Sequence, residues 1–351
     1  MTLSPAETER AVSMFQLQRD YSVKSNAPTY AGILDGCIAD VRAGGPVSSI
    51  VAHWDGVLES VFALRMLAAL HRLALDGKAP KLAGLFLTCG GKQAPEQAWP
   101  AARELIAEHA DYIVAYCGRA PQTNETARSG VLLGGFLTIA AEYPFPLRLR
   151  EIGASAGLNL MWDQYRVTTP AFTWGRSDAR LELSAQWQGE LPPLKAPITI
   201  SDRAACDRDL IDIHKADDRT RLESYIWPDQ PHRMKRLRTA CAIALDTPFR
   251  LDQADAAEWI ERELRNLPEG QTTAVYHSIF RQYLPPAADR KLEDVMTRAG
   301  ARATGKAPLA WLAMEVPRAD AYPDLTLTMW PGGERRKLAT AHYHGDWIKW
   351  L

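Results

Sequence analysis

The sequence lacks the cysteine spacing of a zinc site or of a disulfide framework. Its five cysteines are scattered, and none belongs to a Cys-x-x-Cys pair, which is typical of reduced thiols in the cytosol. A strong charge of one sign is also missing, because the formal net charge is −1. We therefore expect no general attraction to nucleic acid or to an anionic membrane, and a small molecule is the favoured partner.

Long apolar runs are missing as well. The longest, at 131–141, is too short to span a bilayer. The first residues, MTLSPAETERAV, are polar and acidic where a signal peptide would be basic and then apolar. We therefore predict a cytoplasmic protein that does not enter a membrane.

The chain is long enough for one large domain or two. It has 351 residues, of which 46% are hydrophobic and 24% charged, as in ordinary globular proteins. Residues up to about 127 alternate helical patterns with short loops. Within 58–75, apolar residues recur on one broad face, and Asp76-Gly77 is a stop signal. We predict a helical N-terminal cap region over 1–127 and an α/β domain over 128–351.

The stretch PLRLREIGASAGLNLMWDQY, residues 146–165, has the pattern of a strand, a tight turn and a helix. An apolar run ends at Ile152, Gly153 and Gly157 interrupt it, and helical character resumes near Leu158. Glycines allow the backbone to pass close to a ligand, and the start of a helix turns unpaired amide groups towards it. The pattern therefore predicts a ligand-binding turn.

Two chemistries fit this turn. The pattern Glu-x-Gly-x-Ser-x-Gly, from Glu151 to Gly157, resembles the first motif of class I S-adenosylmethionine-dependent methyltransferases, with Ser155 in place of the middle glycine. The pattern Gly-x-Ser-x-Gly matches the nucleophile elbow of α/β-hydrolases, in which Ser155 would be the nucleophile. A dinucleotide fingerprint fits less well, because Leu158 stands where that motif needs a small residue. The turn alone leaves both chemistries open.

The chain after residue 146 alternates strand patterns with helical ones. The strand patterns lie near 147–152, 198–207, 249–251, 272–280 and 308–316. Residues 166–197 are rich in proline, tryptophan and polar residues, and we interpret them as an insertion covering the site. Two further strand-like runs flank a Pro-Gly-Gly turn at 331–333, which predicts an antiparallel hairpin.

This order of elements favours one fold. An α/β-hydrolase has several strands before its elbow, whereas here the preceding residues have helical patterns. We predict an α/β fold that is class I methyltransferase-like, and hence Rossmann-like. It would have a mostly parallel sheet, a C-terminal antiparallel hairpin and a helical N-terminal region.

Several phrases together carry a family resemblance that spans nearly the whole chain. They are QTNETARS, LREIGASAGLNLMWDQY, WPDQPHRMKRLRTA, YHSIFRQYL, PLAWLAMEV and WPGGERRKLATAHYHGDWIKW. The sequence resembles a bacterial family known as domain of unknown function 2332 (DUF2332). The resemblance implies a cytoplasmic bacterial protein with a methyltransferase-like sheet, and it brings no known reaction.

The methyltransferase resemblance implies S-adenosylmethionine as cofactor and gives roles to residues by their place in the motifs. Gly153, Ser155 and Gly157 would line its methionine portion, and Glu151 would order the turn or contact the cofactor's amino group through water. Asp207, at the end of the second strand, would accept hydrogen bonds from the ribose hydroxyls. Asp255, after the third strand, would reach the adenine amino group. His277, at the end of the fourth, would be the catalytic base or would orient the methyl acceptor.

Polar residues precede the apolar helix pattern at 132–143. Asn124, Glu125 and Arg128 lie in QTNETARSG, which can be a capped helix start and nothing more. The functional interpretation places these side chains on the rim of the site, as substrate or rim residues.

Two other hypotheses belong to different functional classes. A serine hydrolase would use Ser155 as nucleophile and His277, His342 or His344 as base. A non-catalytic module would keep the fold and bind a partner or a metabolite, with the eleven tryptophans contributing contact surface. No metal site is predicted, because His342 and His344 have no further ligands that the sequence identifies.

Overall fold

Prolines and capping residues set the helix starts in the first part of the chain. The computed structural model describes residues 3–54, 61–318 and 321–351. Ser4 and Glu7 form a capping box at the start of helix α1, and five helices have a proline in their first turn. These five are α1 (Pro5–Lys24), α2 (Pro28–Arg42), α3 (Pro46–Ala52), α5 (Pro80–Ala83) and α6 (Pro95–Glu108).

The chain folds into two compact units. The helical unit consists of residues up to Thr123 together with His214–Lys235, and the sheet unit consists of Asn124–Ile213 and Arg236–Leu351. The helical unit also contains α4 (Phe62–Leu75), η1 (Leu87–Cys89), α7 (Ala110–Cys117) and α9 (Ala216–Ser224). α4 is the helix predicted over 58–75, and residues 58–60 of that prediction lie outside the described residues.

The segment 214–235 belongs to the helical unit because its aromatic residues enter that unit's core. Tyr225 and Trp227 are buried among the side chains of the first helices. The Ser224 hydroxyl lies 2.7 Å from the Tyr116 hydroxyl, and its carbonyl lies 3.2 Å from Nδ1 of the buried His71. The sequence-based boundary at residue 127 did not include this segment, because nothing local in it marks such distant partners.

A sheet of nine strands organises the sheet unit, in the order β5-β12-β11-β10-β9-β8-β1-β6-β7. The strands are β1 (Leu147–Ile152), β5 (Gln186–Gln188), β6 (Ile200–Asp207), β7 (Arg250–Gln253), β8 (Thr272–Ser278), β9 (Leu309–Glu315), β10 (Asp324–Trp330), β11 (Arg335–Ala341) and β12 (Trp347–Trp350). The predicted α/β class with a mostly parallel sheet is confirmed.

The parallel part of the sheet is doubly wound. β7, β6, β1, β8 and β9 pair in parallel, so the first strand of the five lies in the middle and the order is third, second, first, fourth, fifth. The direction of winding reverses between β1 and β8. In open sheets of this kind, ligands bind outside the carboxyl ends of the strands at this switch point.

The predicted hairpin is confirmed, but it belongs to a longer meander. β10 pairs antiparallel with both β9 and β11, and β11 pairs antiparallel with β12. Gly332 and Gly333 both have positive φ in the connecting turn, a conformation that favours glycine. Because β10 pairs with β9, the first arm of the hairpin lies directly beside the last parallel strand.

The segment 166–197 forms strands of its own. β2 (Arg166–Thr168), β3 (Thr173–Trp174) and β4 (Glu182–Ser184) make a small sheet in the order β3-β2-β4, and β2 and β3 form a hairpin. The segment then adds β5 to the edge of the large sheet, where it pairs with β12. Trp187 stacks on Trp350 there, with ring centroids 5.5 Å apart.

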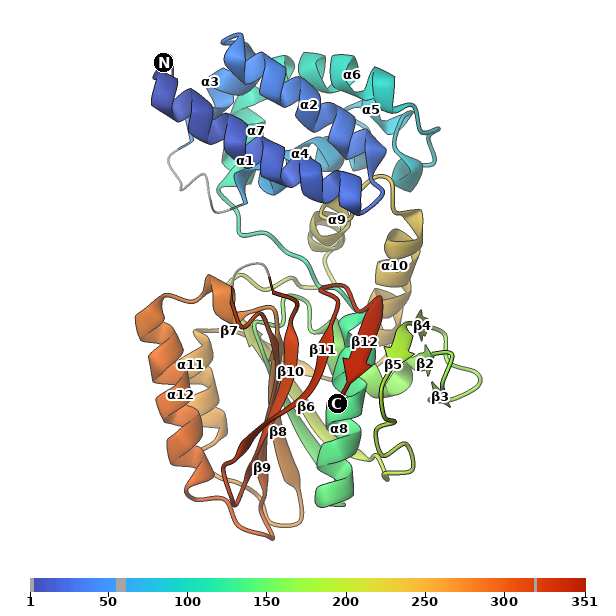
Figure 1. The fold of residues 1–351 in the computed structure, drawn as a ribbon, viewed down its shortest axis with the longest axis vertical. Coiled ribbons are helices and arrows are strands. Elements are labelled where there is room, and N and C mark those ends of the chain that lie inside the picture. The colour runs from blue at the N-terminus through green and yellow to red at the C-terminus, as the bar shows by residue number, and fades with distance from the viewer. Residues whose placement is uncertain (1–2, 55–60, 319–320) are drawn as a thin grey trace. The chain divides into compact units, whose positions relative to one another are not determined.

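Helices cover both faces of the large sheet (Figure 1). α8 (Arg128–Glu142) lies on one face, and α11 (Ala256–Glu263) and α12 (Pro286–Gly300) lie on the other. On the α8 face, Phe136 stacks on Trp162 at 4.3 Å and meets the Tyr276 ring edge-on at 5.0 Å. Helix α10 (Pro231–Leu245) runs from the helical unit into the sheet unit.

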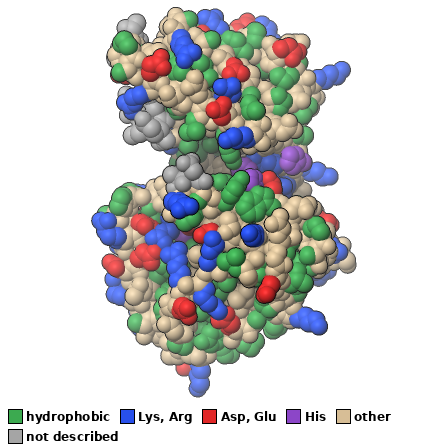
Figure 2. All heavy atoms as spheres, viewed as in Figure 1, with side chains coloured by type: hydrophobic (Ala, Val, Ile, Leu, Met, Phe, Trp, Pro, Cys, Tyr) green, Lys and Arg blue, Asp and Glu red, His purple; other side chains and the backbone are tan. Residues whose placement is uncertain are grey.

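Acidic and basic side chains are interspersed on the face drawn in Figure 2, as a formal net charge of −1 leads one to expect. None of the helices in the described part of the chain is long and apolar enough to cross a bilayer.

Candidate functional site

The turn from Gly153 to Gly157 lies at the carboxyl end of β1, at the switch point of the sheet. Its alternate residues have positive φ, +65° at Gly153, +55° at Ser155 and +71° at Gly157. Positive φ is uncommon for a residue with a side chain, and such strained positions concentrate at functional sites. Ser155 thus differs from the glycine of the methyltransferase motif in side chain, while its φ has the sign that glycine favours.

Both glycines are required by packing inside the protein. A Cβ atom at Gly153 would stand 2.1 Å from Cδ2 of Phe280, and one at Gly157 would stand 2.9 Å from Cε2 of Phe249. The two aromatic rings therefore occupy the space that the missing side chains leave.

The helix after the turn is a short 3₁₀ helix, η2 (Leu158–Gln164). The helix predicted from about Leu158 is therefore present but short, because Gly157 has positive φ and β2 already starts at Arg166. The side chain of Asn124 accepts a hydrogen bond from the Leu158 amide at 3.0 Å. Asn124 therefore belongs to the turn itself and satisfies one of its unpaired amides.

Asp207 fastens the turn to the end of β6. One carboxylate oxygen accepts from the Ser155 amide at 2.7 Å, and the other accepts from the Asp209 amide at 3.0 Å. The backbone adds two more links, from the Ala154 amide to the Cys206 carbonyl and from the Ile211 amide to the Ser155 carbonyl, each 3.1 Å long. The ends of the first and second parallel strands are thereby held together.

Glu151 is a buried carboxyl group beneath the turn. The Tyr276 hydroxyl donates to it at 3.3 Å across the switch point. Burial raises the pKa of Glu151 to about 8, and the charge of Asp207 adds to the rise. Hydrogen bonds from Tyr276 and Asn159 and the charge of Arg128 lower this pKa without reversing the shift. Glu151 therefore holds a proton at neutral pH.

Asn159 links this carboxyl to the start of α8. Its side-chain oxygen accepts from the Ser129 hydroxyl at 2.7 Å, and both residues are buried. Sequence reasoning missed Ser129, Asn159 and Tyr276 as members of the site. The available signal was a polar residue inside an apolar pattern, Asn159 in LNLMW and Ser129 before VLLGGF.

Arg128 and Glu125 hold the start of α8 in place. The Arg128 guanidinium donates to the Tyr343 carbonyl at 3.0 Å and to the Ser278 carbonyl at 3.2 Å. Glu125 accepts from the Ala127 amide at 3.1 Å and from Arg236 at 2.8 Å. The helix begins at Arg128, later than the QTNETARSG pattern indicated, and no side chain of the described residues caps it. Arg128 and Glu125 thus fix the polar start of α8 in place beside the turn.

Asp255 follows the third parallel strand and caps α11. One of its carboxylate oxygens accepts from the amides of Ala257 and Glu258, at 3.1 and 3.3 Å. The neighbouring Ala254 amide donates to the Asp207 carbonyl at 3.0 Å. The backbone thus joins the loop that carries Asp255 to the end of β6.

His277 lies on the other face of the sheet. Trp311 Nε1 donates to its Nε2 at 3.0 Å, so Nδ1 carries the proton towards Glu315, 2.6 Å away. Glu315 also accepts from the Phe280 amide at 2.9 Å. Trp311 belongs to the core beneath α11 and α12, whereas the neighbouring Tyr276 packs against α8. Glu151, Ser155 and Asp207 surround the turn. His277 meets it through Phe280, whose ring lies 5.7 Å from the His277 ring and packs on Gly153.

His342 and His344 lie in the loop between β11 and β12. His342 Nδ1 is 2.9 Å from a carboxylate oxygen of Asp346, and this contact lowers the pKa of Asp346 below its ordinary value. The Gly345 backbone packs on the start of α8, where a Cβ atom would stand 2.5 Å from the Ala127 carbonyl oxygen. Within the described chain, no cluster of three metal-binding side chains is found.

The family model of DUF2332, described as an uncharacterised protein conserved in bacteria, matches residues 12–350. The chain therefore belongs to this family. Comparisons with curated proteins and with solved structures give no match.

Proposed function

We propose that the protein binds S-adenosylmethionine at the carboxyl ends of β1, β6 and β8 and transfers its methyl group to a small molecule. The observation that carries the proposal is the turn with positive φ at Gly153, Ser155 and Gly157, located where a doubly wound sheet reverses direction. An acidic residue precedes this turn, and a second one ends the neighbouring strand. Sheet order, turn conformation and acidic residues agree with the class I methyltransferase resemblance of the sequence.

Asp207 has the chemistry to hold a ribose. It is partly exposed, and each of its oxygens accepts one backbone amide. A carboxylate has about four acceptor positions, so each oxygen can accept one more hydrogen bond from a ribose hydroxyl. The same bonds fix the Ser155 amide, so the residue would orient the turn and the ligand together. Asp255 can contribute its second oxygen, since the cap of α11 uses only Oδ1.

S-adenosylmethionine, when bound, supplies a methyl group on a sulfonium centre, and the chain would bind and orient it. Below a pH of about 8, Glu151 carries its proton. It can then donate one hydrogen bond as well as accept, which suits the amino acid end of the ligand. His277 would be a positioning residue in this scheme, because through Glu315 it fixes the Phe280 amide and the loop after β8.

Calorimetric titration with S-adenosylmethionine and S-adenosylhomocysteine tests the proposal. We expect saturable binding of both ligands. Asp207→Asn should weaken it by about tenfold or more, the range for losing a hydrogen bond to a charged group. Asp246→Asn is the matched control, because Asp246 is exposed and pairs with Arg180 elsewhere on the sheet unit. The absence of binding by folded protein at millimolar ligand rejects the proposal.

A serine hydrolase is the second candidate, favoured by two observations. Ser155 has the positive φ of a strained turn, and His342 has an acidic partner in Asp346 at 2.9 Å. A fluorophosphonate probe should then label the wild type and spare both Ser155→Ala and His342→Gln. Labelling that survives Ser155→Ala excludes this serine as the nucleophile.

A further inference from the structure

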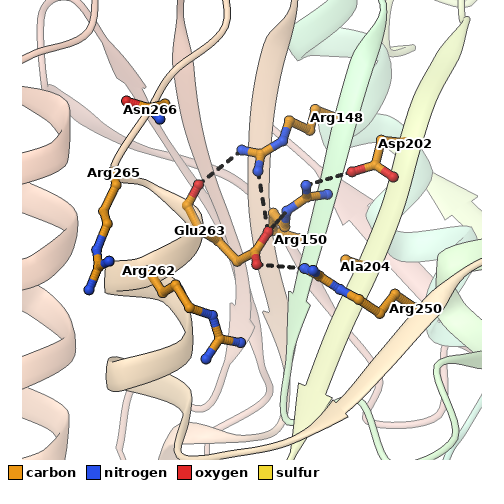
Figure 3. Close-up of a pocket in the computed structure, with 9 residues that line it drawn as sticks. All are labelled: Arg148, Arg150, Asp202, Ala204, Arg250, Arg262, Glu263, Arg265 and Asn266. Atoms are coloured by element: carbon orange, nitrogen blue, oxygen red, sulfur yellow. Dashed lines mark hydrogen bonds and ion pairs between the residues drawn. The ribbon is translucent and has the colours of Figure 1, made fainter.

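A second polar site lies beside the first four residues of β1, at the C-terminal end of α11. It is an open pocket of about 450 Å³, large enough for a small molecule. We call it the arginine pocket, and Figure 3 shows its lining. Its residues are Arg148, Arg150, Asp202, Ala204, Arg250, Arg262, Glu263, Arg265 and Asn266.

Positive charge exceeds negative charge in the arginine pocket. The lining has five arginines and two carboxylates, a surplus of three positive charges. Asp252 lies outside the lining and bonds to Arg250 and Arg262, each at 3.3 Å, so counting it still leaves a surplus of two. This contrasts with the whole chain, whose formal net charge is −1.

Glu263 is the centre of the cluster. Its carboxylate accepts from Arg148 at 3.2 Å, from Arg150 at 2.7 Å and from Arg250 at 2.5 Å. Figure 3 shows these three guanidinium groups pointing towards it, two from β1 and one from β7. Arg150 also donates to Asp202 at 2.5 Å. Three arginines thus share one buried carboxylate, while Asp202 pairs with Arg150 and Asp252 with Arg250 at the edge of the cluster.

The excess of positive charge is least favourable in the buried part of the cluster, where water solvates the arginines poorly. The side chain of Arg148 is 15% exposed and that of Arg150 is 3% exposed. Burial, followed by the charge of Arg150, lowers the pKa of Arg148 to about 10. An anion in the pocket would remove the repulsion between these neighbouring cations.

The outer part of the pocket offers groups for a ligand. Arg250 and Arg262 are each 52% exposed. Arg265 and Asn266 are exposed, and neither has a side-chain partner among the residues that the structure describes. Guanidinium groups match the geometry of phosphate oxygens and bind them in pairs. The helix dipole at the C-terminus of α11 also attracts cations, but it is equivalent to only about half a negative charge. Most of the surplus positive charge therefore stays uncompensated.

We propose that the arginine pocket binds a small phosphate-bearing molecule. Arg250, Arg262 and Arg265 would contact its phosphate groups, while Arg148 and Arg150 supply positive potential from below. Arg148 and Arg150 precede the turn on β1, and the pocket lies on the α11 face, so this site is separate from the one that Asp207 serves. The inference does not depend on methyl transfer.

Calorimetric titration of the full chain with pyrophosphate, at constant ionic strength, tests the proposal. We expect saturable binding that is tighter for pyrophosphate than for orthophosphate or citrate. Arg265→Ala should weaken it by about two- to fivefold, the range for an exposed charge pair, and Arg262→Ala with Arg265→Ala should weaken it further. The folded state should persist in both variants, because Arg265 bonds to no other side chain in the described chain and the Arg262–Asp252 pair is half exposed.

Arg290→Ala is the matched control. Arg290 is an exposed arginine of α12 without a side-chain partner in the described chain, and its removal should leave binding unchanged. Asp207→Asn should also leave pyrophosphate binding unchanged, which separates this site from the proposed cofactor site. A lack of saturable binding, tighter binding of citrate, or equal effects of Arg265→Ala and Arg290→Ala would each overturn the proposal.

Discussion

The two faces of β1 solve the problem of a buried charge in opposite ways. On the face towards α11, Arg148 and Arg150 stay charged and share Glu263. On the face towards α8, Glu151 bonds to the Tyr276 hydroxyl, and its raised pKa keeps it neutral. A buried charge needs a partner of opposite sign, whereas a buried carboxyl group can become neutral by taking up a proton. One strand therefore presents a cationic face and a protonated face.

The largest expected effect comes from removing the shared carboxylate. Glu263→Ala leaves Arg148 and Arg150 buried without their main partner, so we expect the free energy of unfolding to fall by about 3–5 kcal/mol. Denaturation by urea at pH 7 measures the change. Glu261→Ala is the control on the same helix, because Glu261 is 51% exposed and pairs with Arg298. Similar losses in the two variants would contradict the role given to Glu263.

The buried, protonated carboxyl group of Glu151 predicts that stability depends on pH. Glu151 has a folded pKa of about 8, above the ordinary 4.5, so the folded state retains a proton that the unfolded state releases. The stability from this proton is complete below the ordinary pKa and is lost as pH rises through 8. Glu151→Gln cannot titrate and should not share this loss.

Between pH 5 and pH 8, the wild type should therefore lose stability relative to Glu151→Gln by on the order of 3 kcal/mol. Urea denaturation across this range measures the difference. Parallel pH profiles for the two proteins would show that Glu151 titrates normally.

The smallest effect concerns the turn between the two acidic residues. Ser155→Gly should raise the free energy of unfolding by up to about 1 kcal/mol, because glycine adopts positive φ without strain. Ser155→Val should destabilise, because a β-branched residue tolerates this φ poorly. Thermal unfolding of the two variants checks the order. If the proposed cofactor site is correct, Ser155→Gly also keeps S-adenosylmethionine binding.

Local patterns in the sequence were enough to predict most of the sheet. β8 and β9 are mostly buried runs with clear ends, β6 ends at Asp207 as expected, and the Pro-Gly-Gly turn marks the hairpin. Helix α11 has a strong amphipathic pattern, and Asp255, predicted as a cofactor contact, also caps it. α6 begins at Pro95, and a second proline, Pro100, lies inside the helix. The two prolines give the same local signal, so the sequence alone does not show which of them begins the helix.

Long-range partners explain what sequence reasoning missed. Asn159 and Ser129 join Glu151 only because η2 and α8 pack beside β1. His277 lies at the end of the fourth strand, as expected, but its partners Trp311 and Glu315 come from β9, and no local pattern marks them. The arginine pocket gathers side chains from β1, β6, β7 and the end of α11. No single stretch of sequence contains enough of them to mark a site.

The edge strand β5 has a consequence for the timing of folding during synthesis. Its partner β12 lies about 160 residues later, at Trp347–Trp350, and the Gly189 backbone packs against the Trp350 carbonyl, where a Cβ atom would stand 2.0 Å from the oxygen. A ribosome must therefore make residues 347–350 before residues 186–188 can join the sheet. Until then Trp187 lacks its stacking partner Trp350. A nascent chain stalled before β12 would therefore expose an open sheet edge beside one uncovered face of an indole, a surface that chaperones recognise and that promotes aggregation.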